Sequence, residues 1–220
     1  MDDSISGRNM FADPVQAISA LVIPWIAACR DTHEKCRQPQ NLPLPTRVLE
    51  VGDQDEPVYL RDSQRLGGPY TTLTHSWGKT QTLTTTSGTM ARRQHGVSYQ
   101  DLPPTFLDAV KVTRILGIKY LWIDSLCIIQ NLISDWEFEN TKMLEYDLNT
   151  FVTIGAGDGE NSFSGFLHLR NDRKIKLPSQ DNLFIRWRTE HDASAYRDSV
   201  LETRAWCMQE RMLSTRIIHF

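Results

Sequence analysis

The chain has few cysteines, no excess of basic residues and no long apolar run. Its four cysteines are scattered along 220 residues, which is typical of reduced thiols rather than of a disulfide framework. The formal net charge of −3 provides no basic field for duplex nucleic acid. No stretch approaches the roughly 20 apolar residues that span a bilayer, and residues 1–10 lack the order of a secretory signal. These absences predict a cytoplasmic protein with no membrane span and no nucleic-acid partner.

Several common chemical motifs are also missing from the sequence. It contains no GxGxxG, no Walker loop and no HExxH. Ser76 is not in the G-x-S-x-G motif that forms the nucleophile elbow of hydrolases. Cys127 has apolar neighbours and no base beside it, so it is interpreted as a small buried residue rather than a nucleophile. Cys29, His33 and Cys36 share a helical face, but a structural zinc site takes four ligands. That face is therefore interpreted as interior, and no metal site is predicted.

The chain has an ordinary globular composition, with 40% hydrophobic and 23% charged residues. Apolar spacing predicts a helix over 14–36, with an inner stripe that includes Ile18, Leu21, Val22, Trp25 and Ile26. Further helices are expected at 104–116, where Gly117 is a suitable stop, and from 134 onward, and the last one at 205–213. Strands are expected at 46–51, 57–61, 70–74, 118–123, 151–156, 183–188 and 216–220.

Strands that alternate with helices indicate an α/β fold, a mostly parallel sheet with helices on both faces and peripheral helix and strand additions. We expect residues 1–45 to form an amino-terminal helix and a Pro-rich extended segment that pack on an α/β domain of residues 46–220.

Candidate site residues follow two of the predicted strands. Asp124 comes directly after a central strand, where open parallel sheets place ligand-binding residues, although it could equally cap the segment after it. His75, Ser76, Trp77 and Gly78 form a loop after another strand. Its glycine permits close approach of a ligand, and its indole could stack on a base or fill the core.

Charged residues also gather near the carboxyl end of the chain. Arg204 and Glu210 could complete a polar pocket. The alternative is that they form internal ion pairs that hold the last helix to the sheet, because partly buried pairs are common structural devices.

Five blocks of the sequence resemble a known family. Residues 102–130 (LPPTFLDAVKVTRILGIKYLWIDSLCIIQ) and 135–143 (DWEFENTKM) are similar to the central signature of fungal heterokaryon incompatibility (HET) domains. The blocks 70–78 (YTTLTHSWG), 164–170 (SGFLHLR) and 201–220 agree with the family in the same order. The resemblance covers most of the chain.

The resemblance implies a flavodoxin-like fold, because HET domains are distantly similar to Toll/interleukin receptor (TIR) type domains. It also implies an effector of self/non-self recognition that leads to cell death. Some TIR-type proteins cleave NAD with one glutamate, and the residue that matches the DWxxE pattern of the family is Glu139. The alternative for Glu139 is a solvated position on a helix face.

Two functions therefore remain open. The first is a signalling and interaction module, activated by a protein partner and assembling into a homo-oligomer without chemistry of its own. The second is a nucleotide glycohydrolase with NAD as its substrate, in which Asp124 binds the sugar, Glu139 assists cleavage and Trp77 packs on the base. The enzyme requires both carboxylates in one cleft, whereas the module predicts Glu139 in open solvent.

Overall fold

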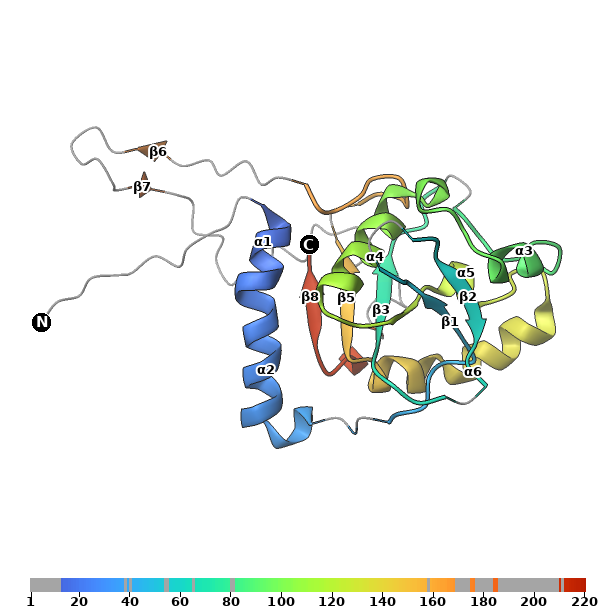
Figure 1. Cartoon of the computed structure of the whole chain (residues 1–220), viewed down its shortest axis with the longest axis horizontal. Helices are drawn as coiled ribbons and strands as arrows, with labels where there is room; N and C mark the ends of the chain where they lie inside the picture. The colour runs from blue at the N-terminus through green and yellow to red at the C-terminus, as the bar shows by residue number, and fades with distance from the viewer. Residues whose placement is uncertain are drawn as a thin grey trace, which may run out of the picture.

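The computed structural model describes residues 13–37, 39, 41–53, 56–64, 66–79, 82–157, 159–168, 175–176, 184–185, 210 and 212–220. The helices are α1 (Pro14–Ala17), η1 (Ile18–Val22), α2 (Ile23–Thr32), η2 (Glu34–Cys36), α3 (Met90–Gln94), η3 (Tyr99–Asp101), α4 (Pro104–Ile115), α5 (Asp124–Cys127) and α6 (Ile133–Asn149). The strands are β1 (Arg47–Glu50), β2 (Tyr59–Asp62), β3 (Tyr70–His75), β4 (Tyr120–Trp122), β5 (Val152–Ala156), β6 (Ile175–Lys176), β7 (Phe184–Ile185) and β8 (Ile217–His219). Figure 1 shows their arrangement.

The main sheet has six strands in the order β2-β1-β4-β3-β5-β8. Strands β4, β3, β5 and β8 are parallel, whereas β1 runs antiparallel to both of its neighbours. Taken in chain order, the parallel strands have the 2-1-3-4 arrangement of a flavodoxin-like sheet. The predicted α/β class with a mostly parallel sheet is confirmed, and β1 and β2 are an antiparallel addition at one edge.

Helices α4 and α6 contact opposite faces of the sheet. Because side chains alternate along a strand, Tyr70 and Thr71 of β3 point in opposite directions. The hydroxyl of Thr71 lies 2.7 Å from that of Thr113 on α4. The hydroxyl of Tyr70 donates to the backbone carbonyl of Tyr146 on α6 at 2.7 Å. The sheet is therefore the middle layer of the domain (Figure 1).

Helix α4 follows the sequence prediction closely. Pro104 occupies its first position, where a missing backbone N–H breaks no helical hydrogen bond. Phe106, Ala109 and Val110 are buried against the sheet. Gly117, with φ of +69°, lies just beyond the end of the helix in the left-handed conformation that favours glycine.

The segments α1, η1 and α2 form one continuous helix, and it differs from the prediction in two respects. It ends at Thr32 rather than at residue 36. Its middle turn is wider, because the N–H of Ile23 bonds to the carbonyl of Ile18 just before Pro24, which has no N–H to donate. The wide turn changes which side chains share a face: Ile18 is buried, whereas Leu21 and Trp25 are 48% and 46% exposed.

Among the described residues, no helix is long and apolar enough to cross a membrane.

Candidate functional site

A pocket of about 180 Å³ opens at the carboxyl ends of β3 and β4. Open parallel sheets bind their ligands at this end of the strands. Strand β3 and the loop after it, the segment after β4, helix α6 and Glu210 all contribute to the wall. The lining residues are Leu73, His75, Trp77, Asp124, Ile128, Gln130, Trp136, Asn140, Met143 and Glu210.

The carboxylate of Asp124 is held in place from both sides. The indole N–H of Trp77 donates to its Oδ2 at 3.1 Å, and the backbone N–H of Ser125 donates to its Oδ1 at 2.7 Å. The side-chain amide of Gln130 donates to the backbone carbonyl of Asp124 at 3.0 Å. Asp124 thus stabilises the local turn and also borders the pocket, where an oriented carboxylate can accept hydrogen bonds from a ligand hydroxyl.

The loop after β3 is tightly packed. His75 is buried, and its ring lies edge-on to that of Phe106, with centroids 5.1 Å apart. The backbone N–H of Gly78 donates to the hydroxyl of Ser76 at 3.3 Å. Gly78 has φ of +68°, and a Cβ there would lie 2.4 Å from Cβ of Asn161, so no larger residue fits. Of the four residues expected in the loop, His75 is instead the last residue of β3, and His75 and Trp77 line the pocket.

The carboxyl-terminal candidates are only partly described. Glu210 lines the pocket, and its backbone carbonyl accepts from the backbone N–H of Ser214 at 3.1 Å. Arg204 and most of the helix expected at 205–213 lie outside the described residues.

Glu139 occupies a different place from the pocket. Its side chain is only 1% exposed and is not part of the pocket wall. Its Oε1 lies 3.0 Å from Nη2 of Arg47, and its Oε2 accepts from the hydroxyl of Tyr146 at 2.8 Å. The same Arg47 nitrogen lies 2.6 Å from Asp135, and Nε of Arg47 donates to the backbone carbonyl of Cys127 at 2.6 Å. Neither the solvated position nor the shared cleft that the two hypotheses expected is found for Glu139.

The buried network affects the protonation of two residues. Burial raises the pKa of Glu139, although the hydrogen bond from Tyr146 and the charge of Arg47 oppose the increase. Burial raises the pKa of Cys127 to about 12, which keeps it a thiol at neutral pH. Cys127 is buried, as predicted, and is unsuited to act as a nucleophile.

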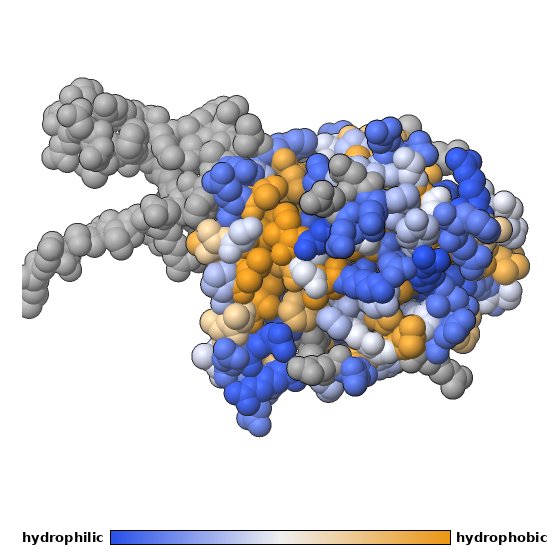
Figure 2. All heavy atoms as spheres, viewed as in Figure 1, coloured by the Kyte–Doolittle hydropathy of each residue, from blue (hydrophilic) through white to orange (hydrophobic). Residues whose placement is uncertain are grey.

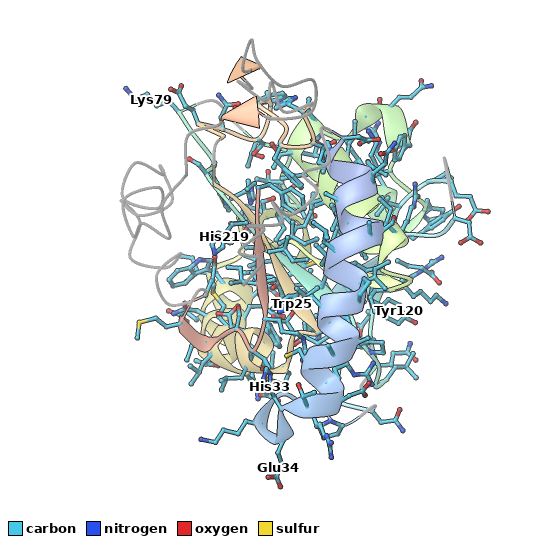
Figure 3. All side chains as sticks on the ribbon, turned by 90° about the vertical axis from the view of Figure 1, so that its left-hand side faces the viewer. Trp25, His33, Glu34, Lys79, Tyr120 and His219 are labelled. Carbon is cyan, nitrogen blue, oxygen red and sulfur yellow. The ribbon has the colours of Figure 1, made fainter. Side chains whose placement is uncertain are left out.

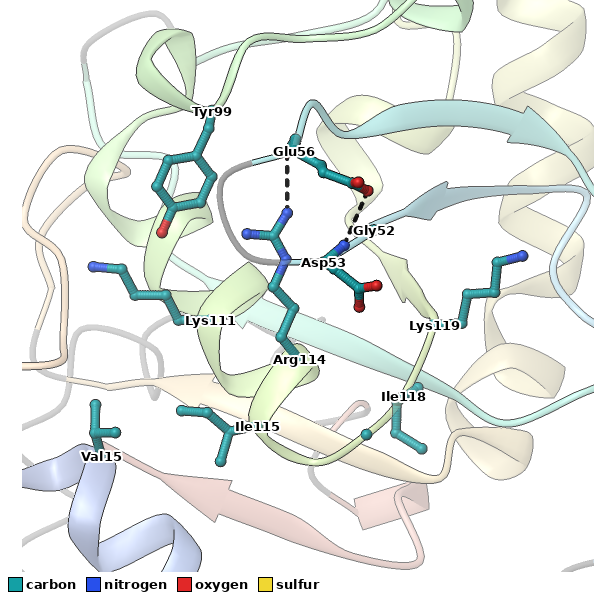
Figure 4. Close-up of a pocket in the computed structure, with 11 residues that line it drawn as sticks. Val15, Gly52, Asp53, Glu56, Tyr99, Lys111, Arg114, Ile115, Ile118 and Lys119 are labelled. Carbon is teal, nitrogen blue, oxygen red and sulfur yellow. Dashed lines mark hydrogen bonds between the residues drawn. The ribbon is translucent and has the colours of Figure 1, made fainter.

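A larger hollow lies at the other end of β4 (Figure 4). Its volume is about 1290 Å³, but it is wide open, and its cations already have partners. Nε of Arg114 donates to the carbonyl of Val51 at 3.0 Å, and Lys119 pairs with Glu50 at 2.7 Å. Because its cations already have partners and it is open to solvent, this hollow is a weaker candidate than the smaller pocket.

Cys29, His33 and Cys36 lie together at the end of the amino-terminal helix. Their ligand atoms are all within 4.8 Å of one another. Burial raises the pKa of the Cys29 thiol, but hydrogen bonds with His33, Cys36 and Arg216 outweigh it, so the pKa is below its usual value. The sequence indicated a shared face for these residues but not that they are in contact.

Two features of this region could not be assigned from the sequence. Arg47 is the counter-ion of Glu139, and its only signal is a lone arginine within a β-branched run. Gln130 and Asn140 line the pocket because the chain folds α6 back beside the end of β4. Both lie within blocks that resemble HET domains, but nothing in those blocks distinguishes them as pocket residues.

Comparison with known proteins gives one match. A family model described as heterokaryon incompatibility protein (HET) matches residues 70–210, which is more than half of the chain. The matched span contains β3, α4, β4, α6, β5 and all of the described pocket residues. No protein with a curated description and no solved structure matches the chain.

Proposed function

Because the chain belongs to the heterokaryon incompatibility protein (HET) family, we propose that it is an effector of self/non-self recognition that acts as a signalling and interaction module. Membership gives it a role in heterokaryon incompatibility. In our proposal, a protein partner activates the domain, the domain self-associates, and the assembly leads to cell death in the cytoplasm. The domain performs no chemistry in this account.

The enclosure of Glu139 in a buried ion pair is the observation that favours this proposal over the enzyme, although the module hypothesis had expected Glu139 in open solvent. A catalytic glutamate must reach the substrate, whereas this one is enclosed by Arg47 and Tyr146. A buried carboxylate with a counter-ion and a hydrogen-bond donor is a structural arrangement, because its charge and its lone pairs are already satisfied. Glycohydrolase chemistry that depends on Glu139 would first require this network to open.

An exposed apolar surface supports the association step. Figure 2 shows apolar side chains in a band over the amino-terminal helix. Leu21 and Trp25, one helical turn apart, are about half exposed, and Ile23 lies between them in the sequence with 39% exposure. Exposed apolar side chains one turn apart on a helix, such as Leu21 and Trp25, are typical of a surface that binds another protein.

The test is a double variant of this surface, Leu21→Gln with Trp25→Gln. Expressed in a filamentous fungus, the wild-type chain should kill cells, and the variant should not. In sedimentation experiments on the purified chain, the variant should associate at least about tenfold more weakly, because buried aromatic and aliphatic anchors contribute most of the binding free energy at interfaces.

The matched control is Leu66→Gln, which makes the same chemical change at a position that is 59% exposed and outside the helix. The control should kill like the wild type. Normal killing and association by the folded double variant would overturn the role of this surface.

The glycohydrolase remains a second candidate because of the pocket. Asp124 is oriented at its edge, and the Trp77 ring lies beside it, which suits a sugar hydroxyl and a flat base. The test is nicotinamide release from NAD by the associated chain. Release by the wild type that Asp124→Asn abolishes without loss of folding would favour the enzyme, and no release by the wild type would favour the module.

A further inference from the structure

Three side chains that bind metals meet at the lower end of the amino-terminal helix, far from the pocket. Figure 3 shows His33 at this end of the helix, near the start of η2. Sγ of Cys29, a ring nitrogen of His33 and Sγ of Cys36 all lie within 4.8 Å of one another. Cys29 is buried, Cys36 is half-buried and His33 is exposed. The cluster is therefore packed against the protein on the Cys29 side and accessible to solvent on the His33 side.

The backbone brings these residues together through a change of helix type. Helix α2 ends at Thr32, and His33 is extended, with φ of −105° and ψ of 110°. The N–H of His33 still bonds to the carbonyl of Cys29 at 3.0 Å, and the N–H of Cys36 bonds to the carbonyl of His33 at 3.0 Å. These two bonds fold the chain into a compact turn that returns Cys36 to the side of Cys29.

The dimensions of the cluster suit a zinc ion. A tetrahedral zinc ion binds sulfur at about 2.3 Å and nitrogen at about 2.0 Å, which spaces its ligand atoms roughly 3.5 to 3.8 Å apart. The three atoms here need to approach by at most about 1.3 Å from a separation of 4.8 Å, which side-chain rotation can supply. Two sulfurs and an imidazole favour zinc over magnesium or calcium, which prefer oxygen ligands.

Arg216 ties the cluster to the sheet. Its Nη1 donates to the backbone carbonyl of Cys36 at 2.8 Å, and its Nε donates to the carbonyl of Phe151 at 2.9 Å. The same guanidinium lies over the ring of Phe151, 5.1 Å from its centroid, and hydrogen-bonds with the thiol of Cys29. A donor that contacts both a ligand sulfur and the ligand backbone is the kind of outer partner that orients metal ligands.

We propose that Cys29, His33 and Cys36 bind one Zn²⁺ ion, with the fourth position open to water. Two thiolates balance the charge of the ion, and binding releases two protons from the thiols. The ion fixes the end of the amino-terminal helix beside the amino ends of β5 and β8, so it stabilises that helix on the domain. The site lies at the opposite end of the parallel strands from the pocket.

The experiment is a titration of the full chain with Co²⁺ under a non-thiol reductant, followed by Zn²⁺. Cobalt bound to thiolates gives a charge-transfer absorption band, and a tetrahedral site adds strong visible bands. We expect saturation at one Co²⁺ per chain and loss of the bands when Zn²⁺ displaces it. Zinc at a hundredfold excess over its Kd should raise the Tm by roughly 5 to 10 °C.

Two variants identify the ligands. Cys29→Ser with Cys36→Ser should abolish the charge-transfer band, and His33→Gln should weaken binding at least about tenfold. His33 is exposed, so its variant remains informative even if the double variant fails to fold. The controls Cys127→Ala and Cys207→Ser remove the other two thiols and should keep the band and the rise in Tm.

A wild-type chain that shows no charge-transfer band would overturn the site. So would a band that persists in the folded double variant, or one that disappears in a control, because the ligands would then lie elsewhere.

Discussion

Helix α6 carries two buried carboxylates in different surroundings. Glu139 faces the guanidinium of Arg47 and the hydroxyl of Tyr146. Asp147, two turns further along, is 2% exposed, and among the described residues its Oδ2 has no hydrogen-bond partner. Burial raises the pKa of Asp147 to about 7. The comparison shows that a facing cation decides the role of a buried acid on this helix. Glu139, which faces Arg47, forms a structural ion pair, whereas Asp147, which faces no cation among the described residues, has a pKa near neutral pH.

The pocket provides a third case. Asp124 is the first residue of the short helix α5, just after β4, and its carboxylate accepts from Trp77 and a backbone N–H. It also borders open space. Of the three acids, Asp124 is the one placed to contact a ligand.

The largest expected effect comes from Arg47→Met, which removes the cation from the paired site. Two carboxylates, Glu139 and Asp135, then lose their counter-ion, and a buried charge without a partner is costly. We expect the free energy of unfolding to fall by about 3–5 kcal/mol, measured by urea denaturation.

The control for this change is Arg61→Met on the neighbouring strand. Arg61 pairs with Glu50 at 2.7 Å, but its side chain is 45% exposed. Water replaces the lost partner there, so we expect a loss of about 0–1 kcal/mol. Equal losses for the two variants would contradict the structural role of the buried pair.

Asp147→Asn tests the acid that lacks a cation. The native carboxyl keeps its proton up to about pH 7, whereas the unfolded one releases it near pH 3.8. Its contribution to stability is therefore present below the lower value and is lost as the pH rises through the upper one. Between pH 5 and pH 8, the variant should gain about 2–3 kcal/mol relative to the wild type.

Urea midpoints at several pH values measure this difference. The matched control is Asp101→Asn at an exposed position, which should follow the wild-type curve. Parallel curves for Asp147→Asn and the wild type would show that Asp147 is not the group that titrates.

The smallest effect is expected in the pocket, from Trp77→Phe. This change removes the donor to Asp124 and leaves the ring. Water can reach a carboxylate at the edge of the pocket, so the unfolding free energy should fall by only about 1 kcal/mol. A loss above about 3 kcal/mol in urea denaturation would mean that the pocket is held together as tightly as the buried pair.

Much of the fold was predictable because its signals are local. Pro104 and Gly117 define the limits of α4, and the β-prone run at 118–123 contains β4. The direction of β1 was not predictable, because a short β-prone run of residues does not indicate whether its strand pairs in a parallel or an antiparallel sense. Leu21 and Trp25 were assigned to the core because periodicity assumes a regular helix, whereas the wide turn before Pro24 rotates them outward.

The site was predictable only in part, for a related reason. Asp124 follows a strand, and residues at the carboxyl end of any strand in an open parallel sheet are candidates for ligand binding. Glu139 was taken for a solvated or catalytic residue because its partner Arg47 lies 92 residues away in the sequence. Contacts across that distance depend on the packing of α6 against β1, which no local pattern encodes.

The measurement that tests the central claim most directly is the behaviour of Glu139→Gln. Arg47 keeps its contact with Asp135 at 2.6 Å, so the variant should remain folded, with a loss of about 1–2 kcal/mol in urea denaturation. Expressed at a temperature where it is folded, it should kill fungal cells as the wild type does, and neither protein should release nicotinamide from NAD. A folded variant that no longer kills, together with wild-type nicotinamide release that the variant lacks, would contradict the account and identify Glu139 as catalytic.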